Sequence, residues 1–164
     1  MPATREELYA RFRELAFETK SWDHDPVFTV DEARALRGEI PGGHCKNLFL
    51  KDKKGQLWLV VTLEEAQVDL KSLPAKIGAA RLSFGKPDLL LEVLGIEPGS
   101  VTPFAVINDT SQRVNVILDE KMMAEELLNF HPLKNDATTT IRSQDLQAFI
   151  EACGHSPKII AVGT

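Results

Sequence analysis

Three segments of this 164-residue chain carry side chains that could act on a polar substrate. In residues 42–47, Lys46 and Asn47 stand at the start of an otherwise apolar strand. An edge-strand lysine also discourages aggregation, so both interpretations stay open. The loop of residues 95–103 has backbone amides that could converge on an oxygen atom, although such a loop also serves as a plain connection. The third segment, residues 130–138, places His131 in a loop before the last helix, and a lone histidine more often has a structural role.

Most familiar catalytic patterns are missing. The chain has no Gly-x-x-x-x-Gly-Lys-Ser/Thr loop and no Gly-x-Gly-x-x-Gly after a strand, which argues against binding of nucleoside triphosphates or NAD. Its four histidines, His24, His44, His131 and His155, lie too far apart for a local zinc motif. Cys45 follows His44 directly, but adjacent strand residues point to opposite faces and no Cys-x-x-Cys supports a metal site. Cys45 is more readily interpreted as a buried thiol than as a nucleophile. We therefore expect neither a metal nor a cofactor.

Composition places the chain among ordinary globular proteins. With 43% hydrophobic and 26% charged residues it is neither disordered nor collagenous nor a coiled coil. Its length predicts a single domain over residues 1–164. No apolar run approaches the roughly 18 residues of a membrane span, and the polar start of the chain does not resemble a signal peptide. Two cysteines suit a reducing compartment, so the expected location is the cytoplasm.

Local signals predict helices and strands in irregular order. A capping box at Thr4–Glu7 predicts a helix over residues 5–17, and a second at Thr29–Glu32 predicts a short helix ending near Gly38. Residues 22–28 between them are expected to be extended. The later elements are expected as follows: a hairpin of 46–50 and 57–63, a helix at 70–77, a strand at 81–84, a helix from Pro87 to Gly95, strands at 101–107 and 113–118, a helix capped by Ser143 and stopped by Gly154, and a strand at 157–162. This order lacks regular βαβ alternation and predicts an α+β fold, a mixed and mostly antiparallel sheet with flanking helices.

Together these segments resemble the YbaK-like trans-editing family of aminoacyl-tRNA deacylases, most closely its free-standing prolyl-tRNA deacylase branch. The resemblance covers nearly the whole chain, and its specificity comes from the order and spacing of the matching pieces. They are Pro26–Ala33, Lys46–Leu50, the Gly99–Pro103 loop of G-x-x-x-P form, His131–Thr138, and the closing stretch from Asp145 to Pro157.

The resemblance implies a function. Members of this family hydrolyse the ester of a wrongly attached amino acid on a tRNA, and in the nearest branch the substrate is alanine on the proline tRNA. A second pocket admits the small side chain and rejects the larger, correct one, which is the principle of a double sieve. The implied partner is the acceptor end of tRNA(Pro), with prolyl-tRNA synthetase as a further candidate; no DNA, membrane or cofactor is implied.

The family pattern also suggests residue roles. Lys46 and His131 would be the catalytic residues. Lys46, in the central role, would hold the terminal phosphate and ribose in register with the ester, and Asn47 and His131 would be polar partners at the terminal adenosine or the ester. Val30 and Ala33 would form the wall that sizes the side chain, with ordinary core packing as an equal alternative. Backbone amides of the G-x-x-x-P loop would face the carbonyl or the amino acid; this loop consists of Gly99, Ser100, Val101, Thr102 and Pro103.

Two other functions fit the same residues. One is a cysteinyl-tRNA(Pro) deacylase, because discrimination by a single methylene or heteroatom is worth only about 1–3 kcal/mol in an apolar pocket. The other is a non-catalytic module that binds tRNA or a synthetase. Selectivity among alanine, cysteine and serine, the means of choosing tRNA(Pro), and the oligomeric state all stay open.

Charge is unevenly distributed along the chain. The formal net charge is −5, yet residues 42–90 hold eight lysines and arginines against five acidic residues. The middle segment therefore carries +3 and the remainder −8. This pattern excludes a protein that coats nucleic acid, and it suits brief contact with one end of a tRNA.

Overall fold

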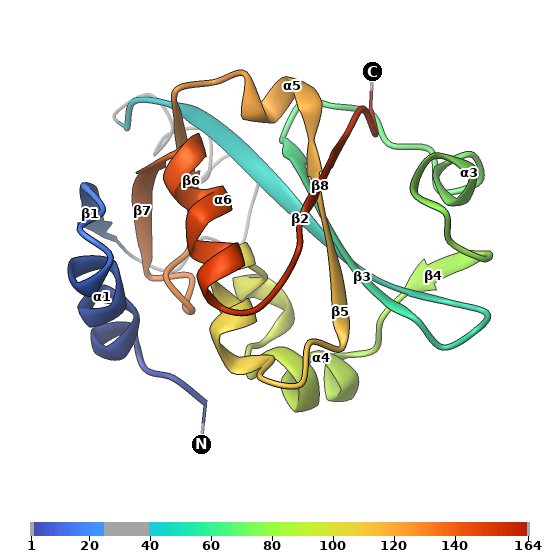
Figure 1. The fold of residues 1–164 in the computed structure, drawn as a ribbon, viewed down its shortest axis with the longest axis horizontal. Helices are drawn as coiled ribbons and strands as arrows, with labels where there is room; N and C mark the ends of the chain where they lie inside the picture. Colours follow the sequence, from blue (N-terminus) through green and yellow to red (C-terminus); the bar gives the residue numbers. More distant parts are fainter. Residues whose placement is uncertain (1, 25–39, 164) are drawn as a thin grey trace.

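The computed structural model describes residues 2–24 and 40–163, which form an eight-stranded mixed sheet with helices packed around it (Figure 1). The strand order is β1-β7-β6-β2-β3-β5-β8, and β4 pairs with β2. Four of the strand pairings are antiparallel and three are parallel. The strands are β1 (Thr19–Asp23), β2 (Gly43–Asp52), β3 (Leu57–Leu63), β4 (Leu82–Phe84), β5 (Val114–Asp119), β6 (Leu127–Phe130), β7 (Ala137–Arg142) and β8 (Lys158–Ile160). The expected α+β class with a mixed sheet is confirmed.

The long strand β2 joins two parts of this sheet. On one side it pairs with β3 over seven residue pairs, from Cys45↔Leu63 to Lys51↔Leu57. On the other side its parallel ladder to β6 consists of two residue pairs only, Gly43↔Leu128 and His44↔Asn129. We call β1-β7-β6 the first panel and β2-β3-β5-β8 with β4 the second panel.

Helix α1 (Arg5–Glu14) begins where the capping box predicted it. The backbone N–H of Glu7 donates to Thr4 Oγ1, and the Glu7 carboxylate accepts from the Thr4 N–H, each at 3.2 Å. These bonds satisfy two of the N–H groups that a helix start leaves without partners. Leu8 and Phe12 bury the inner face of the helix. The helix ends at Glu14, three residues earlier than expected.

The remaining helices are α3 (Leu73–Ile77), α4 (Pro87–Leu94), α5 (Glu120–Met123), α6 (Ser143–Ala152), and the 3-10 helices η1 (Pro98–Ser100) and η2 (Pro103–Asn108). Of these, α4 and α6 lie where they were predicted, α3 is shorter than the predicted 70–77, and α5 and the two 3-10 helices were not predicted. Helix α4 stops at Gly95, whose φ of +66° is the left-handed conformation expected of a terminating glycine. Helix α6 begins directly after Arg142, so Ser143 is its first residue and its hydroxyl makes no capping bond; that prediction was wrong.

The predicted strand at residues 101–107 was also wrong, because this stretch enters η2. Pro103 has no N–H to offer a ladder, and the Thr102 hydroxyl accepts from the Phe104 N–H, which favours a helical turn. Phe104 is fully buried and meets the rings of Phe12 and Phe149 edge-on, at centroid distances of 5.1 and 5.7 Å. This aromatic cluster fixes where the preceding loop ends.

Strands β6 and β7 form an antiparallel hairpin that the sequence did not predict. Residues 137–140 read Ala-Thr-Thr-Thr, and all four are buried. The hydroxyls of Thr139 and Ser21 share a hydrogen bond of 2.8 Å, and the Thr140 hydroxyl donates to Asn129 Oδ1. His131 therefore lies in the connection between two strands, with β7 between it and the last helix.

The two faces of the second panel pack against different cores. Along β3, Leu59 and Val61 belong to the larger core, together with Phe104 and the rest of the aromatic cluster. Trp58 and Val60 belong to the smaller core, which includes the buried residues of α3. The predicted helix at residues 29–38 lies outside the described residues. Within residues 2–24 and 40–163, no helix is long and apolar enough to cross a membrane.

Candidate functional site

Asn47 links strand β2 to the G-x-x-x-P loop. Its Nδ2 donates to the carbonyl oxygen of Val101 at 3.1 Å. Its Oδ1 is buried, and no described residue donates a hydrogen bond to it. A buried amide oxygen without a donor costs free energy unless something supplies the missing bond. Asn47 therefore presents an acceptor that is already removed from water.

The same loop lies against the connection that carries His131. A Cβ atom placed on Gly99 would come within 3.5 Å of Asn135 Nδ2. Ser100 and Thr102 are buried. The Ser100 N–H already donates to the Glu97 carbonyl (2.9 Å), so it is not available to a substrate oxygen. The loop is thus hydrogen-bonded to β2 on one side and lies close to the β6–β7 connection on the other.

The hydrogen bond of His131 defines its tautomer. Its Nδ1 lies 2.9 Å from the carbonyl oxygen of Ala137. A carbonyl can only accept, so Nδ1 carries the proton and Nε2 of the neutral ring is an acceptor. His131 is therefore arranged to accept a hydrogen bond or a proton at Nε2.

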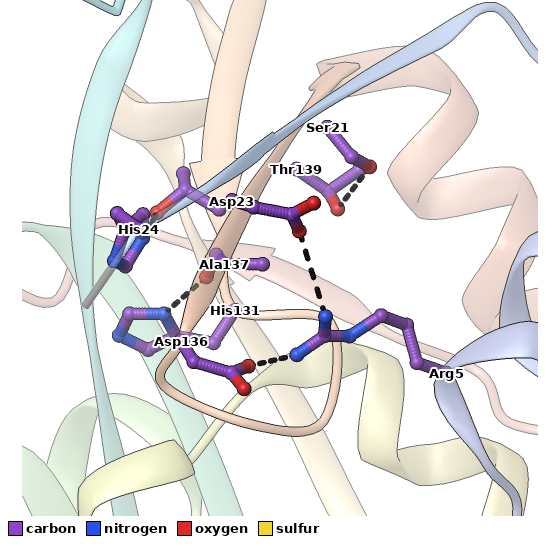
Figure 2. A network of polar contacts seen from close by, with 9 residues as sticks. Arg5, Ser21, Asp23, His24, His131, Asp136, Ala137 and Thr139 are labelled. Carbon is purple, nitrogen blue, oxygen red and sulfur yellow. Dashed lines mark hydrogen bonds and ion pairs between the residues drawn. The ribbon is translucent and has the colours of Figure 1, made fainter. Parts of the chain in front are cut away.

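The surroundings of His131 favour this neutral form. Burial lowers the pKa of the imidazole, and the positive charge that nearby His24 can carry acts in the same direction, while the bond to Ala137 opposes them. The two rings lie 6.4 Å apart between centroids, and His24 in turn lies 2.9 Å from the Thr138 hydroxyl through Nε2. Figure 2 shows the His24 ring above that of His131, and the planes of the two rings are tilted by 59°.

Lys46 lies on the other face of β2. The regular pairing Lys46↔Thr62 and Asn47↔Val61 contains no bulge, so the two neighbouring side chains point to opposite sides of the sheet. The Lys46 ammonium donates to the carbonyl oxygen of Ala66, just beyond β3. The structure therefore places Lys46 and Asn47 on opposite faces of β2.

Cys45 is poorly suited to act as a nucleophile. Burial raises the pKa of its thiol to about 12, and nearby acidic residues add to this effect. The reactive thiolate is therefore scarcely populated at neutral pH. Among residues 2–24 and 40–163, no group of three or more His, Cys, Asp and Glu side chains is placed to hold a metal ion.

Of the residues that the resemblance singled out, the structure gathers Asn47, the Gly99–Pro103 loop and the connection that carries His131. Val30 and Ala33 lie outside the described residues. The sequence did not point to the network around Asp136, the last residue of the connection (Figure 2). Arg5 forms ion pairs with Asp136 and Asp23. Because Arg5 and Asp136 are 131 residues apart, no local spacing could have joined them.

Comparison with known proteins identifies the family of this chain. The aminoacyl-tRNA editing domain matches residues 24–149. The chain belongs to the aminoacyl-tRNA editing domain family. It is 36% identical over 157 residues to the prolyl-tRNA editing protein ProX of Acetoanaerobium sticklandii, covering 95% of this chain and 96% of that protein. It is 38% identical to the prolyl-tRNA synthetase associated domain-containing protein 1 of Xenopus laevis, covering 95% of each chain.

A solved structure of a proposed trans-editing enzyme for prolyl tRNA synthetase has the same fold. Its TM-score is 0.71 at 18% identity, over 99% of this chain and 100% of that one. Membership of the editing-domain family confirms the resemblance inferred from the sequence. It also confirms the expected class of enzyme, an aminoacyl-tRNA deacylase.

Proposed function

We propose that this editing domain is a trans-acting hydrolase that removes alanine from mischarged alanyl-tRNA(Pro). The names of its relatives, a prolyl-tRNA editing protein and a prolyl-tRNA synthetase associated domain-containing protein, support proline tRNA as the carrier. One observation carries the chemistry: His131 is neutral and protonated at Nδ1, and it belongs to the connection that lies close to the Gly99 loop.

The reaction needs little from the protein. Water attacks the carbonyl carbon of the aminoacyl ester, the bond from that carbon to the ribose oxygen breaks, and the ribose oxygen takes up a proton. His131 Nε2 accepts a hydrogen bond from the attacking water or from the neighbouring ribose hydroxyl, which holds the reacting groups in place. The Gly99–Pro103 loop faces the carbonyl, where amides other than that of Ser100 stabilise developing negative charge.

Asn47 supplies the second polar contact in this proposal. Its buried Oδ1 accepts from the α-ammonium of the aminoacyl group or from the terminal ribose. Because this oxygen is already removed from water in the folded protein, a hydrogen bond from the substrate adds no desolvation cost for Asn47, and it favours binding in one orientation.

Size provides the selectivity. Alanine fits a small pocket that rejects proline, and Val30 and Ala33 are the proposed wall of that pocket. Selection by size protects correctly charged prolyl-tRNA, as the double sieve requires.

Lys46 is assigned to the tRNA and not to the ester. Its ammonium lies on the opposite face of β2 from Asn47, so we place it against the terminal phosphate, away from the ester. A lysine is a compact cation with three donors, and it can exchange the Ala66 carbonyl for a phosphate oxygen.

The deciding experiment is deacylation of alanyl-, cysteinyl- and prolyl-tRNA(Pro) by the purified protein. Alanine is expected to be released well above the rate in buffer, with prolyl-tRNA left intact. Alanine release at the buffer rate contradicts the proposal. Preferential release of cysteine indicates the cysteinyl deacylase, and tight binding without turnover indicates a non-catalytic module.

A further inference from the structure

We propose that Arg5 is a positioning residue for His131: through Asp136 it fixes the strand connection so that the Ala137 carbonyl holds the Nδ1–H tautomer. The inference deepens the proposed function, because it explains what keeps the site histidine in the form that the reaction needs. Arg5 comes from the first turn of α1, far from the site in sequence.

The guanidinium of Arg5 binds two carboxylates from different elements. Its Nη2 pairs with Asp136 Oδ1, and its Nη1 lies 3.6 Å from Asp23 Oδ1 (Figure 2). The Arg5 side chain is 21% exposed and that of Asp136 is 44% exposed, whereas Asp23 is 87% exposed. The contact with Asp136 is therefore better shielded from water and is the stronger of the two.

Asp136 is restrained through both its side chain and its backbone. Its side chain is bound by Arg5, and its backbone carbonyl accepts from the His24 N–H at 3.0 Å. The next residue, Ala137, is paired with Asp23 in the β1–β7 ladder. With these three restraints the Ala137 carbonyl has little freedom to turn, and it lies 2.9 Å from His131 Nδ1.

The geometry calls for an arginine. A guanidinium presents several donors in a rigid plane and can face two carboxylates at once, whereas a lysine ammonium is a single point of charge on a flexible stem. A purely structural ion pair at a partly exposed position contributes little to folding stability. The effect of Arg5 should therefore be seen in the state of His131 and not in the melting temperature.

Histidine-selective ¹⁵N NMR tests this directly, because it reports the tautomer of His131 without any substrate. In the unaltered chain His131 should be almost wholly Nδ1–H at neutral pH. In Arg5→Met, which keeps an apolar stem, the Nε2–H form should appear at a comparable level. Arg5→Lys should lie between the two. Arg11→Met is the matched control, since Arg11 is on the same helix and pairs with Glu14 at 3.0 Å, away from Asp136.

Kinetics supply the second readout. In Arg5→Met, kcat for alanyl-tRNA(Pro) should fall about tenfold with KM within about twofold, because misplacing a reacting group lowers the rate more than binding. An unchanged His131 tautomer in Arg5→Met, or the same change in Arg11→Met, overturns the proposal. If Arg5→Met does not fold, Arg5→Lys decides by the same criteria. Absence of deacylation by the unaltered chain refutes the proposed function, while the NMR result still decides the role of Arg5.

Discussion

Replacing Asn47 with alanine should separate function from stability. The substitution removes a hydrogen bond to the Val101 carbonyl, and such a bond is worth about 1 kcal/mol. It also removes a buried Oδ1 for which no described residue is a donor, and an unsatisfied acceptor costs about 1–3 kcal/mol. The two effects oppose each other, so the free energy of unfolding should stay within about 2 kcal/mol of that of the unaltered chain.

The loss of activity should be far larger. A hydrogen bond to a charged group, such as the α-ammonium of the aminoacyl ester, is worth about 1.5–3 kcal/mol. Each 1.36 kcal/mol corresponds to a factor of ten in rate, so deacylation should slow by about 10- to 150-fold. Single-turnover release of labelled alanine measures this rate, and urea unfolding measures the stability.

Asn115→Ala is the matched control for Asn47→Ala. Asn115 Nδ2 also donates to a backbone carbonyl, that of Leu57 at 3.0 Å, but its side chain is on β5. Its deacylation rate should equal that of the unaltered chain. The reasoning is refuted if Asn47→Ala loses more than about 2 kcal/mol of stability while hydrolysing alanyl-tRNA(Pro) at the normal rate.

Three further outcomes are expected. Lys46→Ala should lower the kcat/KM for alanyl-tRNA(Pro) by about 10- to 100-fold, as expected for a lost charged contact. The urea midpoint of unfolding should not change. Near-normal activity would remove Lys46 from the proposed site. Burial lowers the pKa of His131 below its ordinary 6.5, so kcat/KM should fall on acidification only below that pH. The unfolded chain binds the proton at a higher pH than the folded chain does, so the free energy of unfolding should decrease as the pH drops from 6.5 toward the lowered pKa. A fall of kcat/KM that sets in at or above pH 6.5 in the unaltered chain would contradict this role. An unchanged acidic fall of kcat/KM in His131→Gln would contradict it as well. Gly85→Ala should cost about 1–3 kcal/mol in urea unfolding, because its Cβ would come within 2.4 Å of the buried Phe49 ring; a cost below about 0.5 kcal/mol would contradict that contact.

Local chemistry was enough to predict much of the fold. The capping box at Thr4 and the terminating Gly95 each rest on bonds within one turn of chain, so their residues alone specify the start of α1 and the end of α4. The hairpin of β2 and β3 follows from two apolar runs around a short turn. Residues 101–107 were misjudged because an apolar run fits a strand as well as a buried 3-10 turn, and the aromatic contacts of Phe104 decide between them.

The site itself depended on contacts between distant residues. Lys46 and Asn47 were recognised as polar residues at the start of a strand. The alternation of side chains that separates His44 from Cys45 applies to them as well, and the regular register with β3 shows that they face opposite ways. The tautomer of His131 depends on the Ala137 carbonyl, which is presented by a strand that apolar periodicity does not reveal. The β-branched run Thr138–Ile141 was the available signal for that strand.

The narrow seam between the two panels has a mechanical consequence. The ladder between β2 and β6 consists of two residue pairs. Asn47 belongs to β2 in the second panel, and His131 directly follows β6, the strand of the first panel that pairs with β2. A ligand that contacted both Asn47 and His131 would therefore bridge the two panels. Its binding would resist shearing of one panel past the other, and by mass action it would raise the temperature at which the chain melts.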